Sequence, residues 1–263
     1  VLSWLRALGN TGLTVSELGL GTVKLGRDQG VKYPTGFTIP DDHAALDLLG
    51  QARDLGINLI DTAPAYGNSE ERLGKLLQGQ RDHWVICSKV GEDFTDGESS
   101  FDFSPEHVRY SVGRSLRRLR TEMIDLVLVH SDGNDMRIIN ELGTLQALQQ
   151  LKAEGLIRAF GMSTKTVEGG IAAAGQSDVV MLTYNLAQLD ELLVLDKCLE
   201  LGAGALIKKA LASGHLADNF GDPVQASMDL VFGHPGTSSA IIGTINPAHL
   251  AKNCQAARIS LNG

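Results

Sequence analysis

The sequence has few of the features that mark nucleic-acid-binding, membrane-spanning or secreted proteins. It contains 23 lysines and arginines against 31 aspartates and glutamates, for a formal net charge of -8. That balance argues against a nucleic acid or an anionic membrane as partner, because both require a basic face. No apolar run approaches the roughly 20 residues that span a bilayer. The first residues lack the apolar core and cleavage site of a secretory signal, so we expect none.

Cysteine is also scarce. Cys87, Cys198 and Cys254 are odd in number and lie far apart in the chain. Disulfide frameworks and zinc sites normally use cysteines at close, regular spacings. We therefore expect three buried free thiols, no metal site, and a reducing, cytoplasmic location.

The chain does contain enough apolar residues for a full core. Hydrophobic residues make up 43% of its 263 residues and charged residues 21%, which excludes a disordered chain. This length fits one large domain or two small ones. Because no linker or low-complexity segment interrupts the sequence, we expect residues 1–263 to form a single domain.

Short apolar runs alternate with amphipathic stretches along the whole chain. We predict strands at eight of these runs: 18–22, 57–62, 84–89, 126–130, 159–163, 179–185, 205–210 and 239–244. Helices are predicted to start where a capping residue or a proline precedes an apolar stripe, at Asp41, Ser69, Ser104 and Asn246. One long helix is predicted over 137–154.

This alternation predicts an α/β fold of the (β/α)8 TIM barrel type. Strands that are apolar throughout, each followed by a helix, are typical of parallel strands covered on both faces. Eight such units match the usual length of a barrel, about 250 residues. The alternative, an open doubly wound sheet, normally carries a glycine-rich fingerprint after its first strand. Here the nearest cluster, Gly202 and Gly204, precedes its apolar run instead.

Four titratable residues mark the C-terminal ends of neighbouring predicted strands. Asp61, Lys89 and His130 end the second, third and fourth strands, and Tyr66 lies in the loop after the second. In a barrel these side chains converge at one side of the mouth, where barrels carry their chemistry. Each alone has an ordinary structural explanation, in capping, packing or hydrogen bonding. Together they indicate a site, because burial of a lysine and an aspartate requires pairing.

These four residues are suited to reducing a carbonyl group. A Lys89 ammonium would lower the pKa of Tyr66, and Asp61 would keep Lys89 charged and oriented. Neutral His130 and the Tyr66 hydroxyl would each donate a hydrogen bond to the carbonyl oxygen of the substrate. Side chains supply no hydride, so a nicotinamide cofactor is inferred.

Several segments resemble the aldo-keto reductase family, of the bacterial type with a short C-terminus. In the family's order and spacing they are LGLGT, DTAPAYGNSEERLG, SKVG, SLRRLRTEMIDLVLVH, IRAFGMS and IIGTINPAHLAKN. The resemblance covers nearly the whole chain. It implies a barrel that binds NADP(H) in extended form and reduces a small aldehyde or ketone. It also implies a catalytic tetrad of Asp61, Tyr66, Lys89 and His130, with Tyr66 as general acid.

The resemblance further implies a set of cofactor contacts. They are Gly21, Thr22, Asp61, Ser163, Lys208, Leu211, Gly243, Thr244, Asn246, His249 and Asn253. Three positions depart from the family pattern. Thr164 replaces a frequent asparagine, Met181 a frequent glutamine with Asn185 nearby, and Lys208 a frequent aromatic residue.

The cofactor's 2′-phosphate is usually gripped by an arginine after the eighth strand. Ile245 and His249 stand there instead, so NADP(H) is favoured but NAD(H) is possible. The helix that follows offers its N-terminus to a phosphate.

Two rival hypotheses remain open. Lys89 or Lys208 could form a Schiff base, as in barrel aldolases, but this chemistry leaves Tyr66 without a role. The protein could instead be a nucleotide-binding regulatory or partner subunit with little turnover, against which the intact tetrad argues. We expect a monomer or weak oligomer with an open pocket, shaped by the loops after the first, third and fourth strands, of which those at 26–40 and 91–105 are long. Tyr33, Phe37 and Phe94 are expected to line it.

Overall fold

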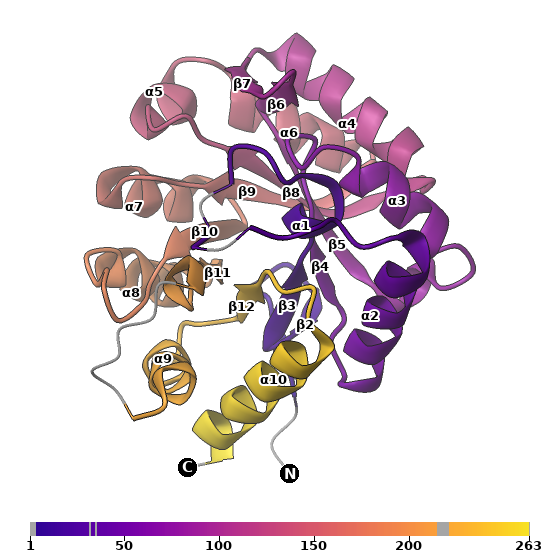
Figure 1. Ribbon diagram of the computed structural model, residues 1–263. Helices are drawn as coiled ribbons and strands as arrows, with labels where there is room; N and C mark the ends of the chain where they lie inside the picture. The colour runs from indigo at the N-terminus through magenta and orange to yellow at the C-terminus, as the bar shows by residue number, and fades with distance from the viewer. Residues whose placement is uncertain (1–3, 32, 35, 215–220, 263) are drawn as a thin grey trace.

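The computed structural model describes residues 4–31, 33–34, 36–214 and 221–262, which form a closed barrel of parallel strands ringed by helices (Figure 1). The strands follow one another round the barrel in the order β3, β4, β5, β8, β9, β10, β11 and β12, and β12 pairs with β3. Their bounds are Leu18–Gly21, Leu59–Asp61, Val85–Val90, Ile124–His130, Ile157–Ser163, Val179–Thr183, Gly204–Lys208 and Ser239–Ile242. The predicted (β/α)8 barrel is confirmed, and each strand falls within or close to its predicted run.

The helices lie outside the strands. They are α2 (Asp42–Asp54), α3 (Ser69–Leu76), α4 (Pro105–Leu119), α5 (Asp135–Asn140), α6 (Thr144–Ala153), α7 (Val167–Gln176), α8 (Leu192–Leu201), α9 (Pro223–Phe232) and α10 (Pro247–Asn262). Two predicted caps are confirmed, because Asp41 accepts from the Ala44 amide and Ser104 from that of His107. Among the described helices, none has the length and hydropathy needed to cross a bilayer.

The single helix predicted over 137–154 is wrong. The structure has two helices there, α5 and α6, separated by a turn at Glu141, Leu142 and Gly143. Gly143 has φ of +73° and serves as the N-cap of α6, a backbone conformation that suits glycine and that no α-helix contains. Thr144 then ties the start of α6 to the loop before α4 by donating to the Phe103 carbonyl.

Alternate side chains of each strand point into the barrel or out toward the helices. The interior is filled by residues such as Leu59, Val85, Leu126 and Met181, whereas the larger outer cluster joins strands to helices. All six residues of β5 are buried. Burial on both faces explains why the strands are apolar throughout instead of alternating with polar residues.

A hairpin that the sequence did not reveal closes the N-terminal end of the barrel. It consists of β1 (Leu5–Ala7) paired with β2 (Thr14–Ser16). Leu8, Leu13 and Val15 of this hairpin join the interior cluster. We call this end of the barrel the floor.

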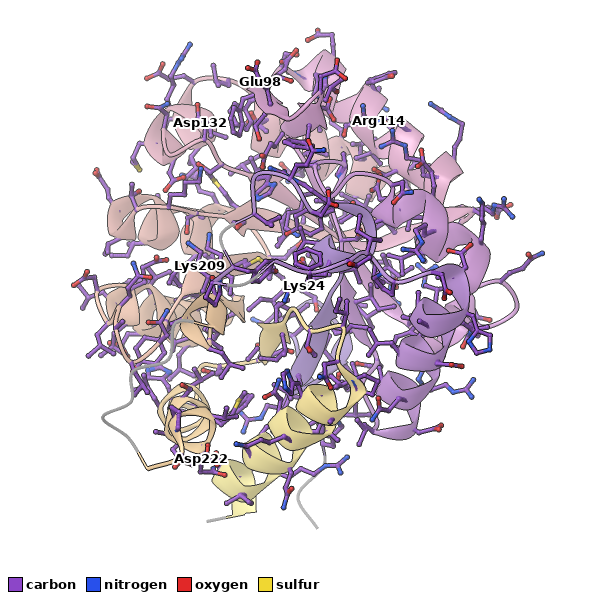
Figure 2. The ribbon with its side chains drawn as sticks, in the orientation of Figure 1. Lys24, Glu98, Arg114, Asp132, Lys209 and Asp222 are labelled. Atoms are coloured by element: carbon purple, nitrogen blue, oxygen red, sulfur yellow. The ribbon has the colours of Figure 1, made fainter. Side chains whose placement is uncertain are left out.

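Two long loops border the opposite end, which we call the mouth. After β3 come the short helix α1 (Val23–Gly26) and a segment that runs across the front of the strands in Figure 1. After β5 comes a second hairpin, β6 (Glu92–Thr95) with β7 (Glu98–Phe101). An ion pair between Asp93 and Arg114 of α4 fixes this mouth hairpin to the barrel; Figure 2 labels Glu98 and Arg114 there.

Candidate active site

A buried ion pair lies at the centre of the mouth. The Lys89 ammonium donates to Asp61 Oδ1 at 2.5 Å and to the Thr62 carbonyl at 2.9 Å. The two side chains are 2% and 5% exposed. Burial lowers the pKa of Lys89, but Asp61, Tyr66 and Cys87 together raise it more, so the net pKa lies above its ordinary value. Lys89 is therefore a charged ammonium at neutral pH.

Tyr66 lies in the turn after β4, over this ion pair. Lys89 Nζ is 4.8 Å from the centroid of the Tyr66 ring, and the His130 ring is 6.2 Å away at an angle of 87°. The four predicted tetrad residues are thus brought together. Burial raises the pKa of Tyr66 more than Lys89 lowers it, so the predicted effect of Lys89 is present but the net pKa lies above its ordinary value. Tyr66 is a neutral phenol at neutral pH and keeps a proton to donate.

Two glycines allow the Tyr66 turn to sit against α1. A Cβ on Gly26 would lie 2.2 Å from the Tyr66 carbonyl oxygen. Gly67, at φ of +61°, would carry a Cβ only 2.0 Å from the Gly26 carbonyl oxygen. Ser69 joins the same contact by donating to Thr22 Oγ1 at 2.8 Å. These contacts hold the backbone of the turn directly against α1 and so fix where the Tyr66 side chain begins.

Sequence reasoning missed Glu92. Its Oε2 lies 2.7 Å from Nδ1 of His130, and Ser99 donates to its other oxygen at 2.6 Å. The 2.7 Å contact is short but bent, so Nδ1 has no hydrogen-bond partner of good geometry. Burial lowers the pKa of His130 more than Glu92 raises it. The only signal in the sequence was that Glu92 falls in one of the two long mouth loops.

Most of the predicted cofactor contacts lie along one side of the mouth. Gly21 ends β3 with its Cα facing Gly243, so that a Cβ there would lie 3.5 Å from the Gly243 Cα. Thr22 donates both its amide and its hydroxyl to the Asp61 carbonyl. Leu211 is half-buried, just beyond β11. The backbone on this side of the mouth is therefore closely packed, since a Cβ on Gly21 would also lie 3.1 Å from the Ile241 side chain.

Ser163 and Lys208 come together beside that backbone. The Lys208 ammonium donates to Ser163 Oγ at 3.0 Å and to the Thr164 carbonyl at 2.5 Å. Burial lowers the pKa of Lys208 to about 8. The Thr164 hydroxyl is buried and has no hydrogen-bond partner. Met181 packs in the barrel interior and offers no polar contact.

The start of α10 contributes the remaining predicted contacts. Asn246 Oδ1 accepts from the amides of Ala248 and His249, and Thr244 Oγ1 accepts from the Asn246 amide. His249 is exposed, whereas Asn253 is only 5% exposed. Asn246 thus caps the amides at this helix N-terminus, where a phosphate was predicted to bind.

The three aromatic residues expected to line the pocket do not share a wall. Tyr33 and Phe37 pack round Lys24, whose ammonium lies 3.9 Å from the Tyr33 ring centroid. A Cβ on Gly243 would lie 3.1 Å from the Tyr33 hydroxyl, so this hydroxyl lies beside one of the predicted cofactor contacts. Phe94 instead stacks under Arg27 at 3.4 Å, on the mouth hairpin. Lys32, Thr35 and two residues of the segment after β11, His215 and Leu216, lie outside the described residues.

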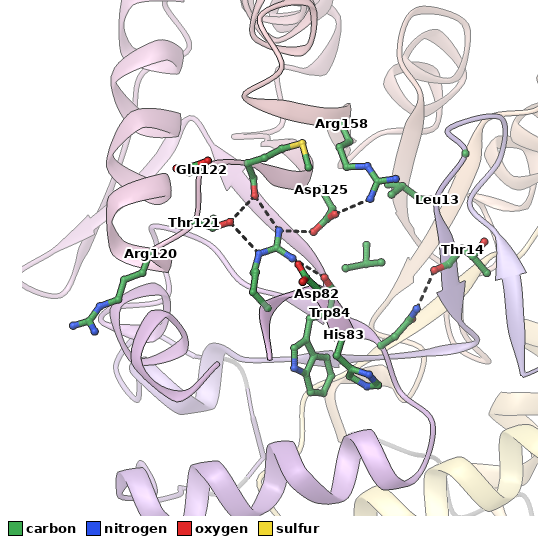
Figure 3. A pocket seen from close by; sticks show the side chains of 15 residues that line it. Leu13, Thr14, Asp82, His83, Trp84, Arg120, Thr121, Glu122, Asp125 and Arg158 are labelled. Atoms are coloured by element: carbon green, nitrogen blue, oxygen red, sulfur yellow. Dashed lines mark hydrogen bonds and ion pairs between the residues drawn. The ribbon is translucent and has the colours of Figure 1, made fainter. Parts of the chain in front are cut away.

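A cavity of about 660 Å³ lies at the floor, away from the tetrad (Figure 3). Arg81 spans it, donating to Thr121, to the carbonyls of Trp84 and Met123, and to Asp125. The charges that line it balance: Arg81, Arg120 and Arg158 against Asp82, Glu122 and Asp125. We interpret it as a structural cluster, because barrels place their chemistry at the opposite end.

Comparison with known proteins assigns the chain to a family. Residues 17–229 match the family model described as "Aldo/keto reductase family". The structure superposes with a TM-score of 0.90 on a provisionally assigned aldo-keto reductase from Pseudomonas aeruginosa, at 57% identity over 98% of this chain and 95% of that one.

Two curated relatives carry named activities. An NADH-specific methylglyoxal reductase of Escherichia coli is 31% identical over 80% of this chain and 68% of its own length. L-galactose dehydrogenase of Arabidopsis thaliana is 40% identical over 60% of this chain. For that plant enzyme the match spans only about half its length, 48%. By the family match and these identities, the chain belongs to the aldo-keto reductase family.

Proposed function

We propose that this protein reduces a small aldehyde or ketone to an alcohol, with Tyr66 as the proton donor. The observation that carries the proposal is the stacking of a neutral Tyr66 over the buried Lys89–Asp61 pair. A carbonyl oxygen that gains negative charge during reduction would be stabilised by the Tyr66 hydroxyl and the Lys89 charge behind it. Lys89 also makes the Tyr66 proton easier to release, and Asp61 keeps Lys89 in place.

A bound nicotinamide would supply the hydride. The residues beside the tetrad fit such a group. The buried Thr164 hydroxyl lacks a partner, and Ser163 pairs in register with His130 on the neighbouring strand, so both residues are available to a carboxamide. Gly21 and Gly243 lie close together on the same side, where larger residues would crowd Ile241 and the Tyr33 hydroxyl.

We propose NADPH as the preferred donor and NADH as the alternative. His249 and Lys252 are exposed on the first turns of α10, where Lys252 offers positive charge and His249 a ring nitrogen to a 2′-phosphate. Neither is an arginine, and Lys252 is already paired with Asp222 at 3.3 Å. The NADH specificity in the name of the E. coli relative also speaks for the alternative. Three buried free cysteines favour a reducing, cytoplasmic compartment.

The test is the oxidation of NADPH, followed by absorbance with a reactive aromatic aldehyde, with NADH in parallel. Tyr66→Phe should lose about 100-fold or more of kcat while still binding the nucleotide. Tyr110→Phe is the matched control, because Tyr110 is 57% exposed on α4 and should keep full activity. If the wild type binds nucleotide tightly but reduces no carbonyl, the partner-subunit hypothesis replaces this proposal. Trapping of substrate on a lysine by borohydride would revive the Schiff-base hypothesis.

A further inference from the structure

Glu92 is held in place from two sides, like a residue with a positional role. Its backbone belongs to the mouth hairpin, which the Asp93–Arg114 ion pair fixes to α4. Its Oε1 accepts from Ser99 across the hairpin at 2.6 Å. The side chain is only 13% exposed, and its second oxygen is left facing His130. The carboxylate therefore has little freedom to turn away from the histidine.

The short distance between Glu92 and His130 requires a proton at Nδ1. A carboxylate oxygen and an unprotonated ring nitrogen both present lone pairs, which repel at 2.7 Å. The contact is attractive only when Nδ1 carries hydrogen, in the neutral Nδ1–H ring or in the imidazolium. The bent approach weakens the hydrogen bond but does not change this sign, because the attraction between N–H and carboxylate is largely electrostatic.

We infer that Glu92 is a positioning residue that holds His130 in its Nδ1–H form, so that Nε2 of the neutral ring is an acceptor. This inference deepens the proposed reductase function and rests on it for its catalytic meaning. A neutral His130 could then not donate a hydrogen bond to a carbonyl from Nε2, contrary to the expectation from sequence. Donation from Nε2 would require the imidazolium, in which both ring nitrogens carry hydrogen.

Other charged groups act on the same ring. Lys89 from β5 and Lys208 from β11 both disfavour the imidazolium, as does burial, while Glu92 favours it. Tyr66 packs edge-on against the ring, and Arg27 lies near Glu92 and favours its ionised form. Glu92 is thus the one acidic side chain among these groups. It favours the imidazolium, although burial outweighs it, and it selects the tautomer of the neutral ring.

The experiment is nuclear magnetic resonance of the full-length protein labelled with ring-15N histidine. His130 signals are assigned by their loss in His130→Gln. At a pH where the ring is neutral, the wild type should show protonated Nδ1 and unprotonated Nε2. In Glu92→Gln the amide can donate to Nδ1, so the proton should move to Nε2. The pKa of the His130 ring should also fall by about 1 unit in this variant, because the carboxylate charge that favours the imidazolium is gone.

Glu98→Gln is the matched control, since it makes the same chemical change on the exposed strand of the same hairpin. It should leave the His130 tautomer as in the wild type. Protonated Nε2 in the neutral wild-type ring would overturn the inference without any variant, as would an unchanged tautomer in a folded Glu92→Gln protein. These readouts need no turnover, so failure of the proposed reductase activity would be seen separately.

If reduction is observed, its pH profile adds a catalytic readout. Wild-type kcat/KM should fall as His130 loses its charge, because Nε2 then has no hydrogen to donate. In Glu92→Gln this fall should disappear, since the neutral Nε2–H ring still donates. A fall of equal size and midpoint in both proteins would contradict the link between the tautomer and catalysis.

Discussion

The mouth and the floor of the barrel both bury charged residues, but they differ in how completely the buried polar groups are hydrogen-bonded. At the floor, Arg81 fills its donors with two side chains and two carbonyls, and Arg158 adds a second cation to Asp125. At the mouth, polar groups are left over: His130 Nδ1 lacks a well-formed hydrogen bond and the Thr164 hydroxyl has none. The floor is not perfect, since the indole nitrogen of Trp84 is also unpartnered.

This difference separates structural from reactive uses of charge. A guanidinium group that makes four hydrogen bonds, as Arg81 does, has little capacity left for a ligand, and it joins neighbouring strand ends. Buried polar groups without a hydrogen-bond partner cost stability, and they persist where a ligand supplies the partner. The comparison therefore predicts that mutations at the mouth affect activity and stability together, whereas mutations at the floor affect stability alone.

The largest effect should come from Lys89→Met. The substitution leaves the Asp61 carboxylate buried, 5% exposed and without its cation. Removal of one partner from a buried pair typically costs about 3–5 kcal/mol. Urea unfolding should show that loss in the free energy of unfolding, and carbonyl reduction should be abolished.

The double variant Asp61→Asn with Lys89→Met tests the cause. If the unpaired carboxylate is what destabilises the single variant, the double variant should regain part of the lost stability and none of the activity. Equal stabilities for the single and double variants would mean that the unpaired Asp61 carboxylate is not what destabilises Lys89→Met.

The Asp61–Lys89 pair shows which parts of the site can be predicted from the sequence. Asp61 and Lys89 could be assigned to one mouth because parallel strands in a barrel put their C-terminal ends together, and this topology follows from hydrophobic patterning. The net pKa of Tyr66 could not be predicted, because it depends on how much burial outweighs the Lys89 charge. Glu92 was missed because a hairpin inside a loop, and the side chain it turns inward, leave no periodic signal in so short a segment.

A second large effect is expected at the floor, from Arg81→Met. Asp125, 5% exposed, would keep the Ile86 amide as a donor but only Arg158, at 3.2 Å, as a cation. The carbonyls of Trp84 and Met123 would lose their donor. We expect a loss of about 2–4 kcal/mol in the free energy of unfolding. Reduction at a temperature where the variant is folded should stay within about two-fold of wild type, since distant sites act independently.

Arg120→Met is the control at the floor, because Arg120 is exposed at the edge of the same cavity. Its stability should change by less than about 0.5 kcal/mol. A marked loss of activity in Arg81→Met, with nucleotide binding retained, would break the division between mouth and floor.

A smaller effect tests whether the position of Tyr66 matters apart from its chemistry. Gly26→Ala puts a methyl group 2.2 Å from the Tyr66 carbonyl oxygen, so the turn must move. Overpacking of this kind costs about 1–3 kcal/mol. Activity should fall although every tetrad residue is present. Gly50→Ala is the control, since a Cβ there has nothing within 4 Å and should stabilise α2 by up to about 1 kcal/mol.

The smallest effect concerns the pH dependence of stability at the mouth hairpin. Burial opposes ionisation of Glu92, but His130, Ser99 and Arg27 outweigh it and lower its pKa to about 2. A carboxylate with a lowered pKa in the folded state stabilises the fold above its unfolded value near 4.5, and this contribution is lost as pH falls toward 2. After a discount for partial exposure, the contribution is about 1–2 kcal/mol.

Wild type should therefore exceed Glu92→Gln in the free energy of unfolding by about that amount at about pH 6, and by much less at about pH 3. Glu98→Gln should differ from wild type by a constant amount over the same range, because it is exposed and outside the His130 contact. A gap between wild type and Glu92→Gln that does not narrow with acid would mean that the Glu92 charge adds nothing to the fold. The carboxylate would then act only on His130. Charge at the mouth would in that case position a reactive group, whereas charge at the floor stabilises the fold.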